Sequence, residues 1–90
     1  GAAVGKHLIG IGYFRTTIGN YCFIGPKALV GAHIFVEDFA FIGQSSLLVS
    51  GKVRNVGGNT LVGAGAVVTK ELPPHVVVVG NPARIIKSRD

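Results

Sequence analysis

The sequence contains a single cysteine, only four acidic residues and no long run of apolar residues. One cysteine excludes an internal disulfide and fits a reducing compartment, so we expect a cytoplasmic protein. No stretch combines the length and apolarity of a membrane span, and no secretory signal peptide is recognisable, so no membrane partner is expected. No segment keeps apolar residues at the spacing of three and four that an amphipathic helix needs. This excludes such helices before the last few residues.

The shortage of acidic residues leaves a net charge of +5 on a chain of 90 residues. This excess raises nucleic acid as a partner. However, the basic residues are dispersed and no nucleic-acid-binding motif is present, so we expect no nucleic acid and prefer a groove for an anionic small molecule. The length indicates one small domain, residues 1–90. Because the chain opens within a repeat-like pattern (Val4-Gly5, Ile11-Gly12), we expect it to be part of a longer protein.

A six-residue repeat runs through most of the chain. Aliphatic anchor residues recur at this spacing and resume after one break, at Ile18, Ile24, Val30, Val36, Ile42, Leu48, Val56, Val62 and Val68. Glycine follows six of these nine anchors, and a mostly small residue stands two positions before eight of them. Alternate residues of a strand point to one side, so the anchor and its small partner both point inward. The pattern predicts an all-β fold, a parallel β-helix whose glycines supply the backbone conformation of sharp corners.

The residue before each anchor should point outward, and most of these residues are large and apolar. If three repeats make one turn, residues 18 apart stack in successive turns, after allowance for the break. Two apolar columns result, Phe23, Phe41 and Leu61, and Leu29, Leu47 and Val67, beside a more polar column of Thr17, Phe35 and Asn55. Single exposed apolar residues are common on protein surfaces, but contiguous columns mark an interface. We therefore expect self-association.

The end of the chain carries a more specific pattern. Residues 62–74 read VGAGAVVTKELPP, and residues 79–84 read VGNPAR. With the repeat, these segments resemble the hexapeptide-repeat acyltransferases, and most of all the branch that acetylates bacterial sugars, such as sialic-acid O-acetyltransferases. The resemblance implies a left-handed β-helix, a homotrimer, and acetyl-CoA in the groove between neighbouring prisms. It also implies acetyl transfer to a hydroxyl or amine of a bacterial sugar or sugar nucleotide, by direct attack of the acceptor.

Several tail residues suit coenzyme A. The short side chains from Gly63 to Gly65 should leave a flat backbone with free N–H and C=O groups for the amide-bearing arm of the cofactor. Lys70 and Arg84 add positive charge, which suits phosphate. Without the resemblance, a solvated basic tail would be the preferred interpretation. With it, the predicted cofactor-binding residues are Gly43, Gly63, Ala64, Thr69, Lys70 and Arg84.

The general base departs from the family's pattern. The resemblance implies a histidine four residues before an early anchor, where this chain has Phe14, which cannot move a proton. One turn later that position is Ala32, so its neighbour His33 lies on the same edge of the prism. We therefore predict His33 as the catalytic base, since histidine titrates near neutrality.

The break in the repeat supports the choice of this edge. Leu48 and Val56 are eight residues apart instead of six, so a short loop is expected within residues 49–54. Irregularities on a repeat scaffold often carry function. Glu37 or Asp38 could orient His33, an expectation that rests on sequence proximity alone.

Other interpretations stay open. His33 could be an ordinary exposed corner residue, and Phe14 favours a catalytically inactive trimerisation scaffold. A zinc carbonic anhydrase would need three histidine ligands that converge. His7, His33 and His75 are 26 and 42 residues apart and do not converge in this register, so no metal site is predicted. Cys22 falls in the inward set and is expected to be a small core residue.

Overall fold

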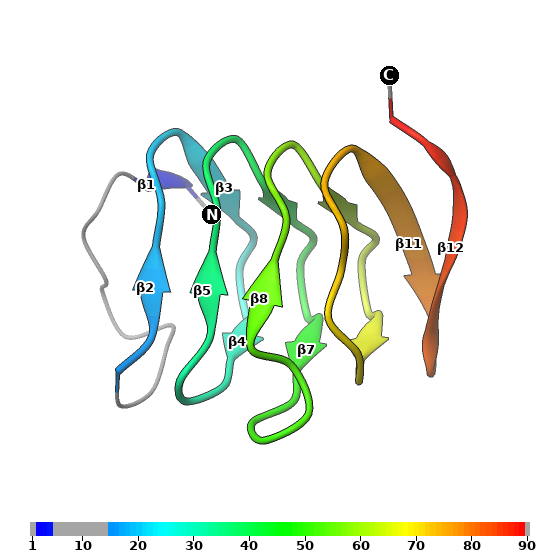
Figure 1. The fold of residues 1–90 in the computed structure, drawn as a ribbon, viewed down its shortest axis with the longest axis horizontal. Helices are drawn as coiled ribbons and strands as arrows, with labels where there is room; N and C mark the ends of the chain where they lie inside the picture. Colours follow the sequence, from blue (N-terminus) through cyan, green and yellow to red (C-terminus); the bar gives the residue numbers. More distant parts are fainter. Residues whose placement is uncertain (1, 5–14, 90) are drawn as a thin grey trace.

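The computed structural model describes residues 2–4 and 15–89, which form a β-helix whose successive coils stack side by side (Figure 1) and build three sheets. Each turn contributes one short strand to each of three faces. The β2 face contains β2 (Thr17–Ile18), β5 (Phe35–Val36) and β8 (Asn55–Val56). The β4 face contains β4 (Leu29–Val30), β7 (Leu47–Leu48) and β10 (Val67–Val68). The β3 face contains β3 (Cys22–Ile24), β6 (Phe41–Ile42) and β9 (Leu61–Val62), and is extended by β1 (Ala2–Val4), β11 (Val76–Gly80) and β12 (Ala83–Ser88).

Three edges join the faces and are named here for what they carry. The loop edge comprises residues 15, 31–33, 49–54 and 69–71, and the green loop between β7 and β8 projects from it in Figure 1. The aromatic edge comprises residues 19–21, 37–39, 57–59 and 73–75. The glycine edge comprises residues 25–27, 43–45 and 63–65. The predicted all-β, left-handed parallel β-helix is confirmed.

The predicted stacking of residues 18 apart is also confirmed. Phe41 pairs with Phe23 on one side and with Leu61 on the other, and both pairings are parallel. The other two columns pair in the same way, so the two extra residues are absorbed by the loop. The final residues, where the sequence did not exclude a helix, form β12, which runs antiparallel to β11. No helix that could cross a bilayer occurs in the described segments 2–4 and 15–89.

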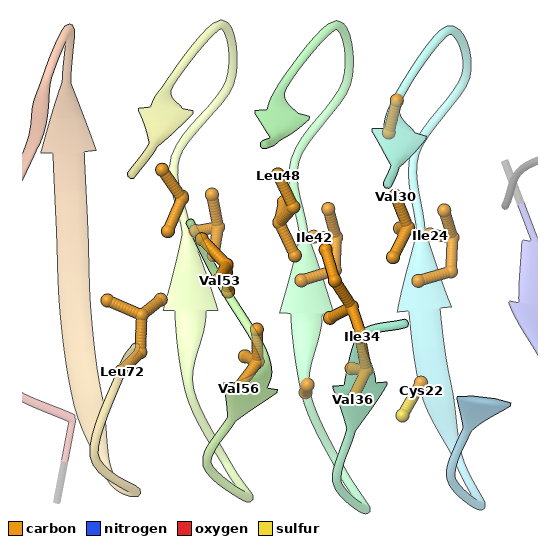
Figure 2. Close-up of a cluster of buried hydrophobic side chains, with 14 of the residues drawn as sticks. Cys22, Ile24, Val30, Ile34, Val36, Ile42, Leu48, Val53, Val56 and Leu72 are labelled. Carbon is orange, nitrogen blue, oxygen red and sulfur yellow. The ribbon is translucent and has the colours of Figure 1, made fainter. Parts of the chain in front are cut away.

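The anchors and their small partners fill the prism (Figure 2). All nine anchors are buried, as predicted. In the eight-residue repeat between Leu48 and Val56, the small inward residue does not lie two positions before the anchor. Arg54 occupies that position and is exposed, while Val53 is fully buried in its place. Cys22 is a buried core residue, as expected.

The glycines after the anchors are required because a side chain would collide with the neighbouring coil, and not because of their backbone conformation. The predicted reason for them was therefore wrong. None of the six has a positive φ. A Cβ added at Gly25 would lie 2.6 Å from the backbone nitrogen of Gln44, in the next coil. Left-handed backbone occurs three residues after the anchor, where Tyr21, His33 and Phe39 have φ of 58°, 60° and 63°.

The first strand does not continue the repeat. β1 pairs antiparallel with β3, with Ala3 opposite Phe23, whereas a repeat coil would pair parallel. The expectation that Val4-Gly5 opens a coil was therefore wrong for Val4. Gly5 and the Ile11-Gly12 pair lie outside the described residues.

Candidate functional site

His33 lies on the loop edge, as predicted. Its side chain is exposed, and its backbone is left-handed, with φ 60°. Together with the loop it lines a pocket of about 350 Å³, whose other lining residues are Ala32, Gly51, Val53 and Arg54. The loop turns through hydrogen bonds from the N–H groups of Lys52 and Val53 to Val49 O. The expected proximity of His33 to the irregular coil is therefore confirmed.

A side chain of this loop fixes the corner that carries His33. The Ala32 N–H donates a hydrogen bond of 2.8 Å to Ser50 Oγ, one coil further on. Phe14, the residue in the place of the family's base, lies outside the described residues.

The two predicted orienting carboxylates line a different pocket from His33. Glu37 accepts a hydrogen bond of 2.7 Å from Asn55 Nδ2, and Asp38 accepts one of 2.7 Å from the Asn20 N–H. Both belong to the aromatic edge, at the other end of β5 from His33. Sequence proximity misled here because a strand carries successive corners apart. This arrangement gives no support to their predicted role beside His33.

The predicted cofactor residues fall into two groups. Gly43, Gly63 and Ala64 lie on the glycine edge and line a mostly apolar pocket of about 370 Å³. Phe23, Phe41 and Leu61 of the first apolar column also line it. Phe23 and Phe41 stack with ring centroids 4.6 Å apart. The pocket is therefore a shallow apolar trough beside a glycine-rich rim.

The second group lies where the β-helix meets its C-terminal strands. Thr69, Lys70 and Arg84 line a pocket of about 400 Å³, with Pro82 and Ile85 among its other lining residues. Lys70 and Arg84 are both exposed, so their charges are available to a bound anion. Lys70 sits at a corner, as predicted, and Arg84 is carried on β12. The two pockets flank β10, which separates Ala64 from Thr69.

The expected free backbone of the glycine-rich segment is only partly present. The Gly63 N–H donates to Val78 O and the Gly65 N–H donates to Gln44 O, both at 2.8 Å. These hydrogen bonds join neighbouring coils, and the sequence pattern did not reveal that these two N–H groups are used in this way. Gly43 also has a packing reason to lack a side chain, because an added Cβ would lie 2.6 Å from the Ala64 nitrogen.

The histidines do not form a metal site among the residues that the structure describes. His33 lies on the loop edge and His75 on the aromatic edge, while His7 is outside the described residues. No group of three histidine, cysteine or acidic side chains in segments 2–4 and 15–89 could hold a metal ion.

Proteins of similar sequence and structure are acetyltransferases. A presumed acetyltransferase of Schizosaccharomyces pombe is 32% identical over an alignment 89 positions long, which covers 79% of this chain and 42% of that protein. WeeI of Acinetobacter baumannii superposes with a TM-score of 0.78 and 39% sequence identity, and the match covers 84% of this chain and 37% of the WeeI chain. A perosamine N-acetyltransferase of Caulobacter crescentus, solved in complex with CoA and GDP-perosamine, superposes with a TM-score of 0.76 and 34% sequence identity. The match covers 81% of this chain and 34% of the transferase chain.

The chain thus spans less than half the length of each of these proteins. No protein-family profile matches it. The predicted resemblance to the hexapeptide-repeat sugar acetyltransferases is nevertheless confirmed, because the two solved structures share the fold and 39% and 34% of the aligned residues.

Proposed function

We propose that this chain is the coenzyme-A-binding β-helix of an acetyltransferase that acts on a bacterial sugar or sugar nucleotide. The observation that carries this proposal is the pair of pockets flanking β10. One offers an apolar trough with a glycine rim, and the other offers the basic side chains of Lys70 and Arg84. An elongated molecule with an apolar arm and phosphate groups matches this combination. The structural relative solved with CoA and GDP-perosamine supports the same ligand class.

The loop edge supports an anionic acceptor such as a sugar nucleotide. Arg15, Lys52, Arg54 and Lys70 all belong to this edge, and Glu71 is the acidic residue there among those described. Arg54 and His33 line the same pocket. A phosphate held by Arg54 would bring the attached sugar next to the proposed base.

In the proposed reaction His33 acts as a general base. A neutral ring nitrogen accepts the proton of the acceptor hydroxyl or amine, whose oxygen or nitrogen attacks the thioester carbon of acetyl-CoA. The carbon–sulfur bond then breaks, the acetyl group remains on the acceptor, and the leaving sulfur takes up the proton. No covalent acetyl-enzyme is required.

A homotrimer would cover the apolar side chains on two faces of the prism. These faces, β3 and β4, meet at the glycine edge, while His33 lies on the loop edge at the other side of the β4 face. The β4 face carries Leu29 and Leu47, which are 41% and 38% exposed, and the β3 face carries the half-buried Phe23, Phe41 and Leu61. Association through these two faces would bury all five side chains and gather the glycine edges around the trimer axis.

The test is acetyl transfer by the chain, followed as release of the coenzyme A thiol with GDP- and UDP-linked amino sugars and free sialic acid as acceptors. Replacement His33→Ala should slow transfer by about a hundredfold or more, the usual contribution of a general base, and leave coenzyme A affinity unchanged. His7→Ala is the matched control and should keep wild-type turnover. Full turnover by His33→Ala would exclude His33, and binding of coenzyme A without turnover of any acceptor would favour the inactive scaffold.

A further inference from the structure

A further pocket lies on the aromatic edge, away from every residue proposed for acetyl transfer. Its volume is about 400 Å³, and it is lined by Phe35, Glu37, Asp38, Phe39, Gly58, Asn59 and His75. His33 lies at the opposite end of β5, five residues before Asp38, which corresponds to roughly 15 Å of extended chain. The pocket is therefore separate from the loop edge.

Two aromatic rings, those of Phe35 and Phe39, line this pocket. The side chains of Phe35 and Phe39 are 46% and 58% exposed, and these exposed fractions are high for large apolar residues. Tyr21 stacks on Phe39 with ring centroids 5.4 Å apart and an interplanar angle of 13°. This contact fixes the orientation of an exposed apolar surface that the monomer does not cover.

Polar side chains held by hydrogen bonds also line the pocket. Glu37 Oε2 is held by Asn55, and Asp38 Oδ1 is held by the Asn20 N–H. Each carboxylate thus has one oxygen anchored by the protein, which sets the direction of the other. Asn59 Nδ2 lies 3.1 Å from His75 Nδ1, so the amide is oriented as well.

The charge of the pocket is unusual for this chain. Glu37 and Asp38 are two of the three acidic residues in the described segments, while the chain as a whole carries +5. The Arg89 guanidinium donates a hydrogen bond of 3.4 Å to Phe39 O, but the two adjacent carboxylates outnumber it and disfavour a phosphate or carboxylate ligand at this position. The donor set also does not form a metal site in the part of the chain that is described.

We propose that this pocket binds a neutral saccharide ring. Sugar hydroxyls donate hydrogen bonds, which carboxylate oxygens accept strongly, and the Asn59 amide can both donate and accept. The C–H face of a pyranose is apolar and can pack on the exposed rings of Phe35 and Phe39. A concave site with aromatic lining and a few oriented polar groups is typical of small-ligand sites. This inference does not depend on acetyl transfer, since it uses none of the residues proposed for that reaction.

The pocket can be tested by NMR titration of the isotope-labelled chain with N-acetylglucosamine, methyl galactoside and maltotriose at millimolar concentrations. At least one of these neutral probes should shift amide resonances of the aromatic edge, both in the wild type and in His33→Ala. N-acetylneuraminic acid, which is anionic, should not bind there. A response confined to the loop edge or the glycine edge, or no response to any neutral probe, would overturn the proposal.

Two variants make the test specific to this pocket. Glu37→Gln should weaken saccharide binding about tenfold, because it removes a charge-assisted hydrogen bond. Glu71→Gln, the same change on the loop edge, should leave the affinity unaltered. Phe39→Leu keeps an apolar side chain but removes the ring, and it should also weaken saccharide binding. This second variant tests the pocket even if Glu37→Gln does not fold. Wild-type affinity in folded Phe39→Leu would contradict the proposed stacking.

Discussion

At the scale of single residues, the distance between coils decides which side chain each position tolerates. A side chain at Gly25 would meet the backbone of Gln44, which cannot move without breaking the parallel pairing. At Gly51 an added Cβ would meet nothing within 4 Å, although its φ is +78°. The two glycines therefore serve different purposes, one for space and one for conformation.

This difference predicts opposite outcomes for two substitutions. Gly25→Ala should lower the free energy of unfolding by about 1–3 kcal/mol, because overpacking forces backbone shifts. Gly51→Asn should change it by less than about 0.5 kcal/mol, because asparagine tolerates left-handed backbone and the space is open. Urea denaturation of both variants measures this, and a loss at Gly25 no larger than that at Gly51 would show that the coils can separate enough to accept a Cβ at Gly25.

Cys22 should be unreactive in the folded protein. Its Sγ lies 3.1 Å from Glu37 O, and burial raises the pKa of the thiol. Because the folded pKa exceeds the unfolded one, this group stabilises the fold below the unfolded pKa, and that stabilisation is lost as the pH rises towards the folded pKa. Reaction with a disulfide reagent should be at least about a hundredfold slower for the native than for the urea-unfolded chain. Equal rates would mean that this part of the prism opens readily.

At the scale of elements, the irregular loop supports the corner that carries His33. The hydrogen bond from Ala32 N–H to Ser50 Oγ joins the two coils directly. Ser50→Ala should cost about 1 kcal/mol of stability and speed the amide exchange of Ala32, because that N–H loses its partner. Hydrogen exchange followed by NMR measures the second effect, with Ser45→Ala on the glycine edge as the control. Unchanged exchange at Ala32 would show that the loop does not hold this corner.

The strands could be predicted well from the sequence wherever burial of one aliphatic side chain determines their position. Burial of an aliphatic anchor every six residues fixes each strand, so the three faces and their register followed from the spacing alone. Val53 could not be placed, because two extra residues allow several inward partners and only packing selects among them. The link between Gly63, Gly65 and neighbouring coils was also invisible, since backbone hydrogen bonds leave no trace in residue type. The roles of Lys70 and Arg84 came from the resemblance, and the structure adds that they share one pocket.

At the scale of the whole molecule, the apolar columns predict a trimer. Phe41 stacks on Phe23 in the middle of the β3 face, so a charge there would be buried against apolar neighbours on association. Phe41→Asp should therefore dissociate the assembly, and sedimentation velocity should show a monomer where the wild type sediments as a trimer. Thr17→Asp, on the more polar β2 face, should stay trimeric. A monomeric wild type at micromolar concentration would contradict the proposed assembly.

The most direct measurement for the central claim is calorimetric titration of the chain with coenzyme A. We expect the wild type to bind, and we expect Lys70→Ala and Arg84→Ala each to weaken binding by about tenfold or more, because each removes a charge-assisted contact. Lys52→Ala, outside the pocket that contains Lys70 and Arg84, should bind as the wild type does. Unchanged affinity in both pocket variants, or no binding by the wild type, would contradict the claim that this β-helix is a coenzyme-A-binding part of an acetyltransferase.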